Sequence, residues 1–160
     1  MQGEFWLEPM ITDDGSLEYR LKFIDPAARN ERITEVISLS DADAVLLRDG
    51  LQKLYGWAEK ARERGVSRRY DKIAVCFPQS ACGNRVVGNS STQLDFLIYE
   101  DGALGARLIR NRGPHQTKWN MSVESASLLS AYFDFVLEAG STELKQGSVT
   151  DEDLDDLFDE

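Results

Sequence analysis

Residues 37–47 read ISLSDADAVLL and residues 119–129 read WNMSVESASLL, and the two stretches share one pattern. In each, an alternating run that is typical of a strand passes through a serine into Ala and Leu at helical spacing. Ser40 and Ser122 stand at equivalent places, where a hydroxyl accepts a hydrogen bond from a free amide of the first helical turn. The two serines lie 82 residues apart, which predicts two copies of a strand-strand-strand-helix unit. The alternative is that any strand-to-helix junction has this pattern.

Alternation of apolar and polar residues predicts seven strands, at about residues 4–9, 17–25, 32–39, 71–78, 92–100, 103–112 and 117–122. A first helix is expected after Ser40, with a buried stripe of Ala44, Leu47, Leu51, Leu54 and Ala58. Gly50 and Gly56 weaken this helix and suggest a bend or break. A second helix is expected from about Val123 to Ala139, with Gly140 ending it. We predict an α+β fold, a curved antiparallel sheet backed by helices.

The charge is distributed unevenly along the chain. The formal net charge is −10, but residues 151–160, DEDLDDLFDE, contain seven acidic groups and no basic one, which leaves about −3 for the rest. We expect one domain over residues 1–140, made of repeats at about 1–65 and 66–140, and a disordered linker and acidic tail over 141–160. The nearly balanced domain is compatible with a local basic groove.

Several classes of protein are disfavoured by composition. No basic stretch followed by an apolar run opens the chain, and no apolar window approaches a membrane span, so we expect no signal peptide and no membrane partner. Cys76, Cys82 and His115 cannot form a four-ligand zinc site, and we expect reduced cysteines and a surface histidine, a five-residue disulfide loop being the alternative. No catalytic or phosphate-loop motif occurs. We therefore expect no enzyme activity, no metal, no cofactor and a cytoplasmic location, with nucleoid association or a phage origin left open.

The arrangement of strands, serine cap and helix in ISLSDADAVLL and WNMSVESASLL resembles the Whirly and positive-cofactor-4-like single-stranded DNA-binding proteins. In that group a curved antiparallel sheet runs into a helix through a small polar cap, and Whirly chains contain two such units. The ending SLLSAYFDFVLEAG is similar to their final helix. The resemblance implies binding of single-stranded DNA by residues 1–140, with little sequence preference.

Single strands are held by aromatic faces and by cations that follow the phosphates. The strands offer such residues on a polar sheet surface, which we expect to remain free of the helices. The candidate nucleic-acid-binding residues are Arg20, Lys22, Lys72, Arg85, Gln93, Tyr99, Arg107, Arg110, Lys118 and Asn120, of which Arg85 lies in the polar loop 79–92. The alternative is an ordinary solvated sheet face. Trp6 and Trp119 are expected in the core.

The acidic tail embeds Leu157 and Phe158 among Asp155, Asp156 and other acids. It is similar to the C-terminal tails of replication-type single-strand-binding proteins, which implies autoregulation or recruitment of replication or recombination proteins; a solubility role is the alternative. The second helix carries apolar residues around most of its circumference, Leu128 and Phe135 among them, which predicts a homo-oligomer.

The lead hypothesis is therefore a single-stranded DNA-binding protein of replication, recombination or repair, with RNA as an alternative ligand. The rival hypothesis is an acidic protein-interaction or inhibitor module that mimics DNA.

Overall fold

The structure is a computed structural model that describes residues 4–25, 32–82 and 90–147. These residues form seven strands, one 3₁₀ turn and two helices, which confirms the α+β class and the element order predicted from the sequence. The elements are β1 (Glu4–Ile11), β2 (Leu17–Asp25), β3 (Arg32–Ser40), α1 (Asp41–Glu63), β4 (Tyr70–Phe77), η1 (Gln79–Ala81), β5 (Ser90–Ile98), β6 (Leu104–Arg112), β7 (His115–Ser122) and α2 (Val123–Gly147).

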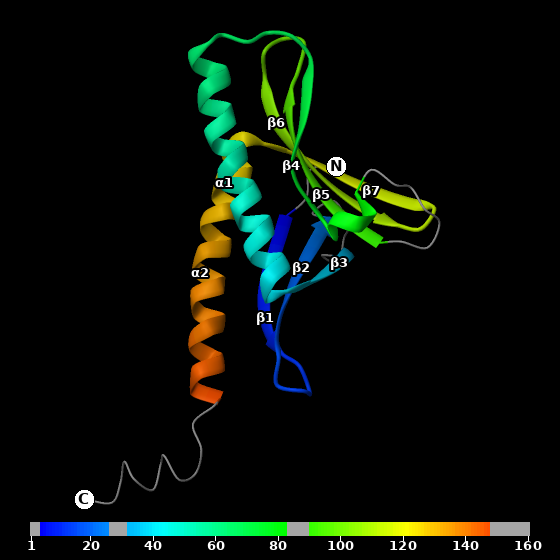
Figure 1. Cartoon of the computed structure of the whole chain (residues 1–160), viewed down its shortest axis with the longest axis vertical. Helices are drawn as coiled ribbons and strands as arrows, with labels where there is room; N and C mark the ends of the chain where they lie inside the picture. Colours follow the sequence, from blue (N-terminus) through cyan, green and yellow to red (C-terminus); the bar gives the residue numbers. More distant parts are fainter. Residues whose placement is uncertain (1–3, 26–31, 83–89, 148–160) are drawn as a thin grey trace, which may run out of the picture.

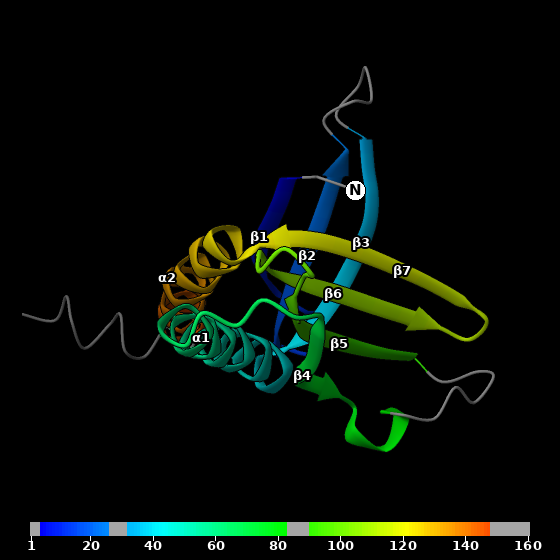
Figure 2. The same ribbon diagram turned by 90° about the horizontal axis from the view of Figure 1, so that it is seen from above.

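The strands divide between two antiparallel sheets, a division that the sequence pattern did not predict. One sheet has the order β1-β2-β3 and the other the order β4-β5-β6-β7. Each sheet is followed in the chain by one long helix, and the strands of the two sheets cross each other (Figures 1 and 2). Side chains of the two sheets therefore point in different directions, which decides which candidate residues can act together.

The core lies where the apolar faces of the two sheets and the helices meet. Tyr19, Leu21 and Ile37 of the first sheet are fully buried, and so is Leu94 of the second. The predicted buried stripe of α1 is confirmed, because all five of its residues have at most 1% of their surface exposed. Trp119 is also in the core, at 2% exposed, as expected.

The two helix starts have the same hydrogen bond, as the repeated junction predicts. The Ser40 hydroxyl accepts from the Asp43 amide at 3.1 Å, and the Ser122 hydroxyl accepts from the Ser125 amide at 3.1 Å. Burial repeats as well. Ala44 and Leu47 are buried at the first junction, as are their equivalents Ala126 and Leu129 at the second, whereas Leu46 and Leu128 are exposed.

The expected break in α1 and the expected end of α2 at Gly140 are both wrong. α1 is continuous through Gly50, and α2 continues through Gly140 to Gly147, so residues 141–147 of the expected linker are helical. A β-carbon at Gly140 would lie 2.6 Å from the Tyr19 hydroxyl, and one at Gly50 would lie 2.5 Å from Cγ1 of Val75. These glycines therefore allow strands to approach the helices closely, which is a packing role rather than a stop signal.

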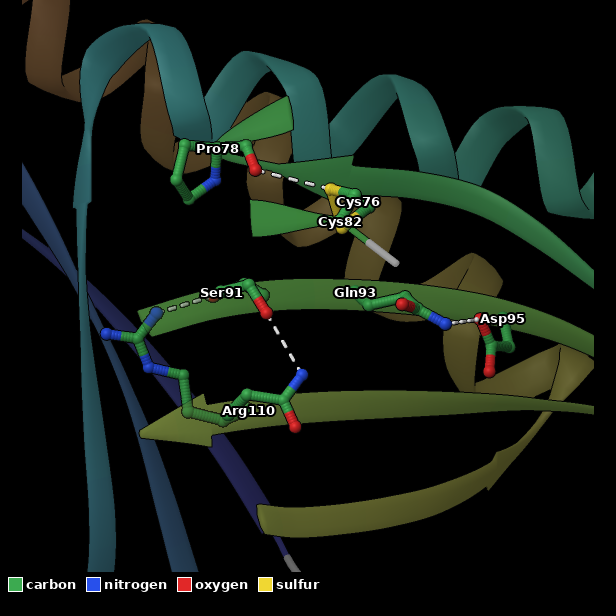
Figure 3. Close-up of a disulfide and its surroundings, with 9 residues drawn as sticks. Cys76, Pro78, Cys82, Ser91, Gln93, Asp95 and Arg110 are labelled. Carbon is green, nitrogen blue, oxygen red and sulfur yellow. Dashed lines mark hydrogen bonds between the residues drawn. A yellow bond between two sulfur atoms is a disulfide. The ribbon is translucent and has the colours of Figure 1, made fainter. Parts of the chain in front are cut away.

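The expectation of reduced cysteines is also wrong. Cys76 and Cys82 form a disulfide, with their α-carbons 6.0 Å apart (Figure 3). The 3₁₀ turn η1 reverses the chain after β4 and brings Cys82 back beside the strand, within the separation that a disulfide spans. The Cys82 Sγ lies 3.3 Å from the Pro78 carbonyl oxygen, but as a disulfide sulfur it has no proton to donate.

In the described ranges, neither α1 nor α2 is long and apolar enough to cross a lipid bilayer. The same ranges contain no group of three or more His, Cys, Asp or Glu side chains that could hold a metal ion. His115, at the start of β7, is exposed.

Candidate nucleic-acid interface

Alternation along β5, β6 and β7 directs one set of side chains away from the buried core. Leu94, Leu108 and Trp119 face the core, so their strand neighbours point to the opposite side of the sheet. We call this side the open face. It carries Gln93, Asp95, Arg107, Ile109, Lys118 and Asn120, together with Asp71 of β4.

Arg107 stands at the centre of the open face and is surrounded by carboxylates. Its guanidinium lies 3.3 Å from Oδ2 of Asp95 and 3.7 Å from Oδ2 of Asp71. Asp95 is 5% exposed and also accepts a hydrogen bond of 2.7 Å from Gln93 (Figure 3). A buried carboxylate needs such partners, so the Arg107 charge is largely balanced by Asp95 and Asp71 within the sheet. Its Nε, which is buried, has no hydrogen-bond partner within the described ranges.

Tyr99 lies at the end of the open face, against a glycine of the neighbouring strand. A β-carbon at Gly105 would lie 3.0 Å from Cε2 of Tyr99, so the absence of a side chain makes room for the ring. The ring is 43% exposed and lines an open pocket of about 600 Å³. Arg69, Asp71 and Arg107 line the same pocket. An exposed aromatic ring beside guanidinium groups is an arrangement that stacks on a planar ligand.

Lys118 and Asn120 extend the open face along β7. Asn120 lies opposite Arg107, and Lys118 lies opposite Ile109. Both side chains are exposed, and Lys118 makes no ion pair with any described residue. These residues offer a free cation and an amide next to the more constrained Arg107.

Arg20 and Lys22 belong to the other sheet and do not join the open face. The Lys22 ammonium lies 2.6 Å from Glu8, and the Arg20 guanidinium lies 3.8 Å from Glu18. Trp6 is opposite Lys22 on this outward side and is 53% exposed, so its expected place in the core is wrong. Trp6 stands on the face of β1 that points away from Leu7, the buried neighbour.

Lys72 and Arg110 point to the core side of their sheet, so the expected single polar surface is split. Lys72 lies over the ring of Trp57 in α1, with its Nζ 4.6 Å from the ring centre. Arg110 donates a 2.8 Å hydrogen bond to the Thr92 hydroxyl. Burial, together with the nearby Arg112 charge, lowers the pKa of Arg110.

Arg85 and the tail residues Asp155, Asp156, Leu157 and Phe158 lie outside the described residues.

Sequence reasoning missed the two carboxylates of the open face, although a signal for one was present. A tight turn at Asp101-Gly102 pairs Tyr99 with Ala103, and counting back along both strands sets Asp95 opposite Arg107. Charges directly opposite on neighbouring strands interact. Asp71 could not be found this way, because β4 is joined to β5 by a long connection.

No family model matches this chain, and no curated protein matches it. Among solved structures, the chain is similar to WHY1 from Arabidopsis thaliana, with a TM-score of 0.37 and 13% sequence identity. The similarity covers 93% of this chain and 94% of that one.

Proposed function

We propose that the protein binds single-stranded DNA on its open face, without strong sequence preference and without catalysing a reaction. One observation carries the proposal: the exposed ring of Tyr99 stands beside an open pocket of about 600 Å³ on a sheet that also presents Arg107, Lys118 and Asn120. Stacking on aromatic rings and cation contacts with phosphates are sequence-tolerant, since every base has a flat face and every nucleotide a phosphate.

The proposal extends to the biological setting expected from the sequence. The protein acts in DNA replication, recombination or repair as a cytoplasmic homo-oligomer, and its acidic tail recruits partner proteins through Leu157 and Phe158. Support for the tail comes from the sequence alone, where seven acids flank these two apolar residues.

The binding test uses variants of the open face that spare its buried ion pair. Lys118→Gln removes an exposed cation, and Tyr99→Ala removes the exposed ring, whereas a change at Arg107 would leave Asp95 buried without its partner. Binding of an oligothymidylate is titrated against salt concentration. Each lost phosphate contact should reduce the magnitude of the salt slope by about 0.7, so Lys118→Gln should bind less tightly and less salt-dependently. Tyr99→Ala should weaken binding by about 1–3 kcal/mol with the salt slope unchanged.

Lys22→Gln is the matched control. It removes the same charge as Lys118→Gln, but from the other sheet and from a lysine that is already paired with Glu8. Equal losses in Lys22→Gln and Lys118→Gln would contradict the assignment of binding to the open face. Duplex DNA and RNA oligonucleotides of the same length, titrated in parallel, decide between ligands.

A second candidate function is an inhibitor that mimics DNA, and the same pocket favours it. Asp71, Glu100 and Asp101 line the pocket beside Tyr99, and the whole chain has a net charge of −10. Carboxylates spaced on a surface can replace phosphates for a basic partner. Absence of oligonucleotide binding at low salt, together with competition against DNA for a basic DNA-binding protein, would favour this function over the first.

A further inference from the structure

A second basic and aromatic site lies away from the open face, between α1 and β4. Residues 53–72 carry seven basic and three acidic side chains, a local charge of +4 in a chain whose net charge is −10. β4 is the outermost strand of its sheet and lies beside α1 (Figure 2). The positive segment therefore folds back on itself, with the end of the helix next to the start of the strand.

A shallow groove of about 200 Å³ runs between these two elements. Lys60 in the last turn of α1 and Arg64, which caps that helix, form one wall, and Tyr70 and Lys72 of β4 form the other. Phe96 and Ile98 lie behind them, and no carboxylate of the described residues lines the groove. Its volume is below the roughly 300–1,000 Å³ of pockets that enclose whole small-molecule ligands, so a ligand would be only partly enclosed and would extend into solvent.

Trp57 holds two ammonium groups near the groove. The Nζ atoms of Lys72 and Lys53 lie 4.6 Å and 5.2 Å from the centre of its ring. A tryptophan face attracts cations, and it limits the rotamers of these two long side chains. The ring packs in turn near Phe96, with the centroids 6.0 Å apart. Lys72, which lines the groove, is therefore partly ordered before any ligand binds.

Among the described residues, the cations in and beside the groove have no carboxylate partner, a property they share with Lys118 of the open face. Lys53, Lys60, Arg64 and Lys72 make no ion pair with any residue of the described ranges, whereas Arg62, on the same turn of α1, pairs with Glu59 at 2.9 Å and Glu124 at 2.7 Å. Cations at the end of a helix are favoured by its dipole, which accounts for Lys60 and Arg64. The helix dipole does not account for the presence of Lys72 and an exposed Tyr70, which belong to β4.

We propose that this groove binds one phosphorylated nucleoside unit, with Lys60, Arg64 and Lys72 contacting the phosphate and Tyr70 stacking on the base. Three unpaired cations favour an anion, and the Tyr70 ring, 42% exposed at the rim, adds a face for a planar group. A phosphorylated nucleoside combines both features. Such a unit is supplied either by a free nucleotide or by the phosphorylated end of a strand.

The site is independent of the open face. Asp71 and Lys72 are consecutive in β4, so their side chains point to opposite sides of the sheet, Asp71 toward Arg107 and Lys72 toward Trp57. Nucleotide binding in the groove does not require that the open face binds DNA, and the two are tested with different variants.

The experiment titrates the full chain with thymidine 5′-monophosphate and with inorganic phosphate, followed by calorimetry or by NMR shifts. Arg64→Gln is compared with Arg62→Gln, which removes the same charge from the same end of α1 but outside the groove. Arg64→Gln should weaken nucleotide binding roughly tenfold, as expected for a lost hydrogen bond to a charged group. Arg62→Gln should change it less than twofold. Tyr70→Leu should weaken binding of the nucleotide and leave that of inorganic phosphate unchanged.

Oligothymidylates with a 5′-phosphate and a 5′-hydroxyl separate the two sources of the ligand. Tighter binding of the phosphorylated strand that is lost in Arg64→Gln supports recognition of a strand end; equal binding of the two strands, with the nucleotide still bound, supports a free nucleotide. Tyr99→Ala, on the open face, should not affect the nucleotide. The proposal is overturned if the nucleotide does not bind at millimolar concentration, if Arg62→Gln and Arg64→Gln weaken it equally, or if Tyr70→Leu has no effect.

Discussion

The rings of Phe23 and Trp119 stack with their centroids 3.8 Å apart and their planes at 10°. Phe23 belongs to β2 of the first sheet and Trp119 to β7 of the second, and each is 2% exposed. The pair therefore joins the two sheets at the point where their apolar faces meet. Aromatic pairs add a geometric preference to the burial of their area.

Phe23→Ala should lower the free energy of unfolding by about 3–5 kcal/mol, because it leaves a cavity beside Trp119 as well as losing the buried ring. Denaturant unfolding followed by tryptophan fluorescence measures the change. Phe5 packs edge-on against Phe23, with the ring centroids 5.0 Å apart, and is only half-buried, so Phe5→Ala should lower the free energy of unfolding less. A loss below about 1 kcal/mol in Phe23→Ala would mean that the sheets do not depend on this contact.

The strands and caps could be predicted because they depend on local patterns, whereas the face of Lys72 depends on an irregularity. The pairing of β4 with β5 shifts between Ile73 and Val75. Strict alternation would set Ile73 with Val75 in the core and Lys72 outside. The bulge reverses this, so Ile73 is 53% exposed and Lys72 faces α1. A one-residue insertion in the pairing leaves no clear trace in a single sequence.

The open face could be predicted only in part, because only some of its residues follow from local alternation. The residues of β5, β6 and β7 follow regular alternation, and Gln93, Arg107, Lys118 and Asn120 do share one side. Arg20 does not join them, because the first three strands form a separate sheet. Nothing local in the sequence indicates this separation. The crossing of the sheets is a long-range packing outcome.

Two glycines of α1 should respond oppositely to alanine. A β-carbon at Gly50 would lie 2.5 Å from Val75, so Gly50→Ala should destabilise the chain by about 1–3 kcal/mol through overpacking. In the part of the chain that the structure describes, no atom beyond the helix's own neighbouring backbone lies within 4 Å of a β-carbon at Gly56, and the residue is exposed. Gly56→Ala should therefore stabilise the helix by about 0.5–1 kcal/mol. Thermal unfolding of both variants checks the signs, and equal effects would contradict the close approach of β4 to Gly50.

Acid should weaken the turn between β1 and β2. Hydrogen bonds from Ser16 and Thr12 lower the pKa of Asp14 from 3.8 to about 2. A carboxyl whose pKa is lower in the folded state contributes stability above its unfolded value, and this contribution is lost as the pH falls from about 4 to about 2. Asp14→Asn should therefore remove part of the pH dependence of unfolding in that window. Asp13→Asn is the matched control, and an identical acid dependence in Asp14→Asn and the parent would contradict the assignment.

The outward side of α2 should mediate self-association. Leu128 is 74% exposed and Phe135 is 70% exposed, and seven residues separate them, so they lie on one side of the helix. Large exposed apolar groups at this spacing are typical of a contact between subunits. Sedimentation at micromolar concentration should show a species above the 18.0 kDa monomer, and Phe135→Lys should dissociate it. Leu46→Lys, at the position in α1 that is equivalent to Leu128, is the control. A monomeric parent would contradict the prediction.

Reduction of the Cys76–Cys82 disulfide should destabilise the fold modestly. The bond joins residues six apart, and the chain-entropy relation gives about 2 kcal/mol for so short a closed loop. Reductant should lower the free energy of unfolding of the parent by this amount and should not affect a Cys76→Ser, Cys82→Ser double variant. Thiol counting before and after reduction accompanies the measurement, and two free thiols in the untreated protein would contradict the bond.

The same count on protein taken rapidly from cells tests the expected cytoplasmic location. A reducing compartment keeps accessible cysteines reduced, so a bond that is formed in cells would contradict that location, while free thiols that become oxidised only after lysis would agree with it.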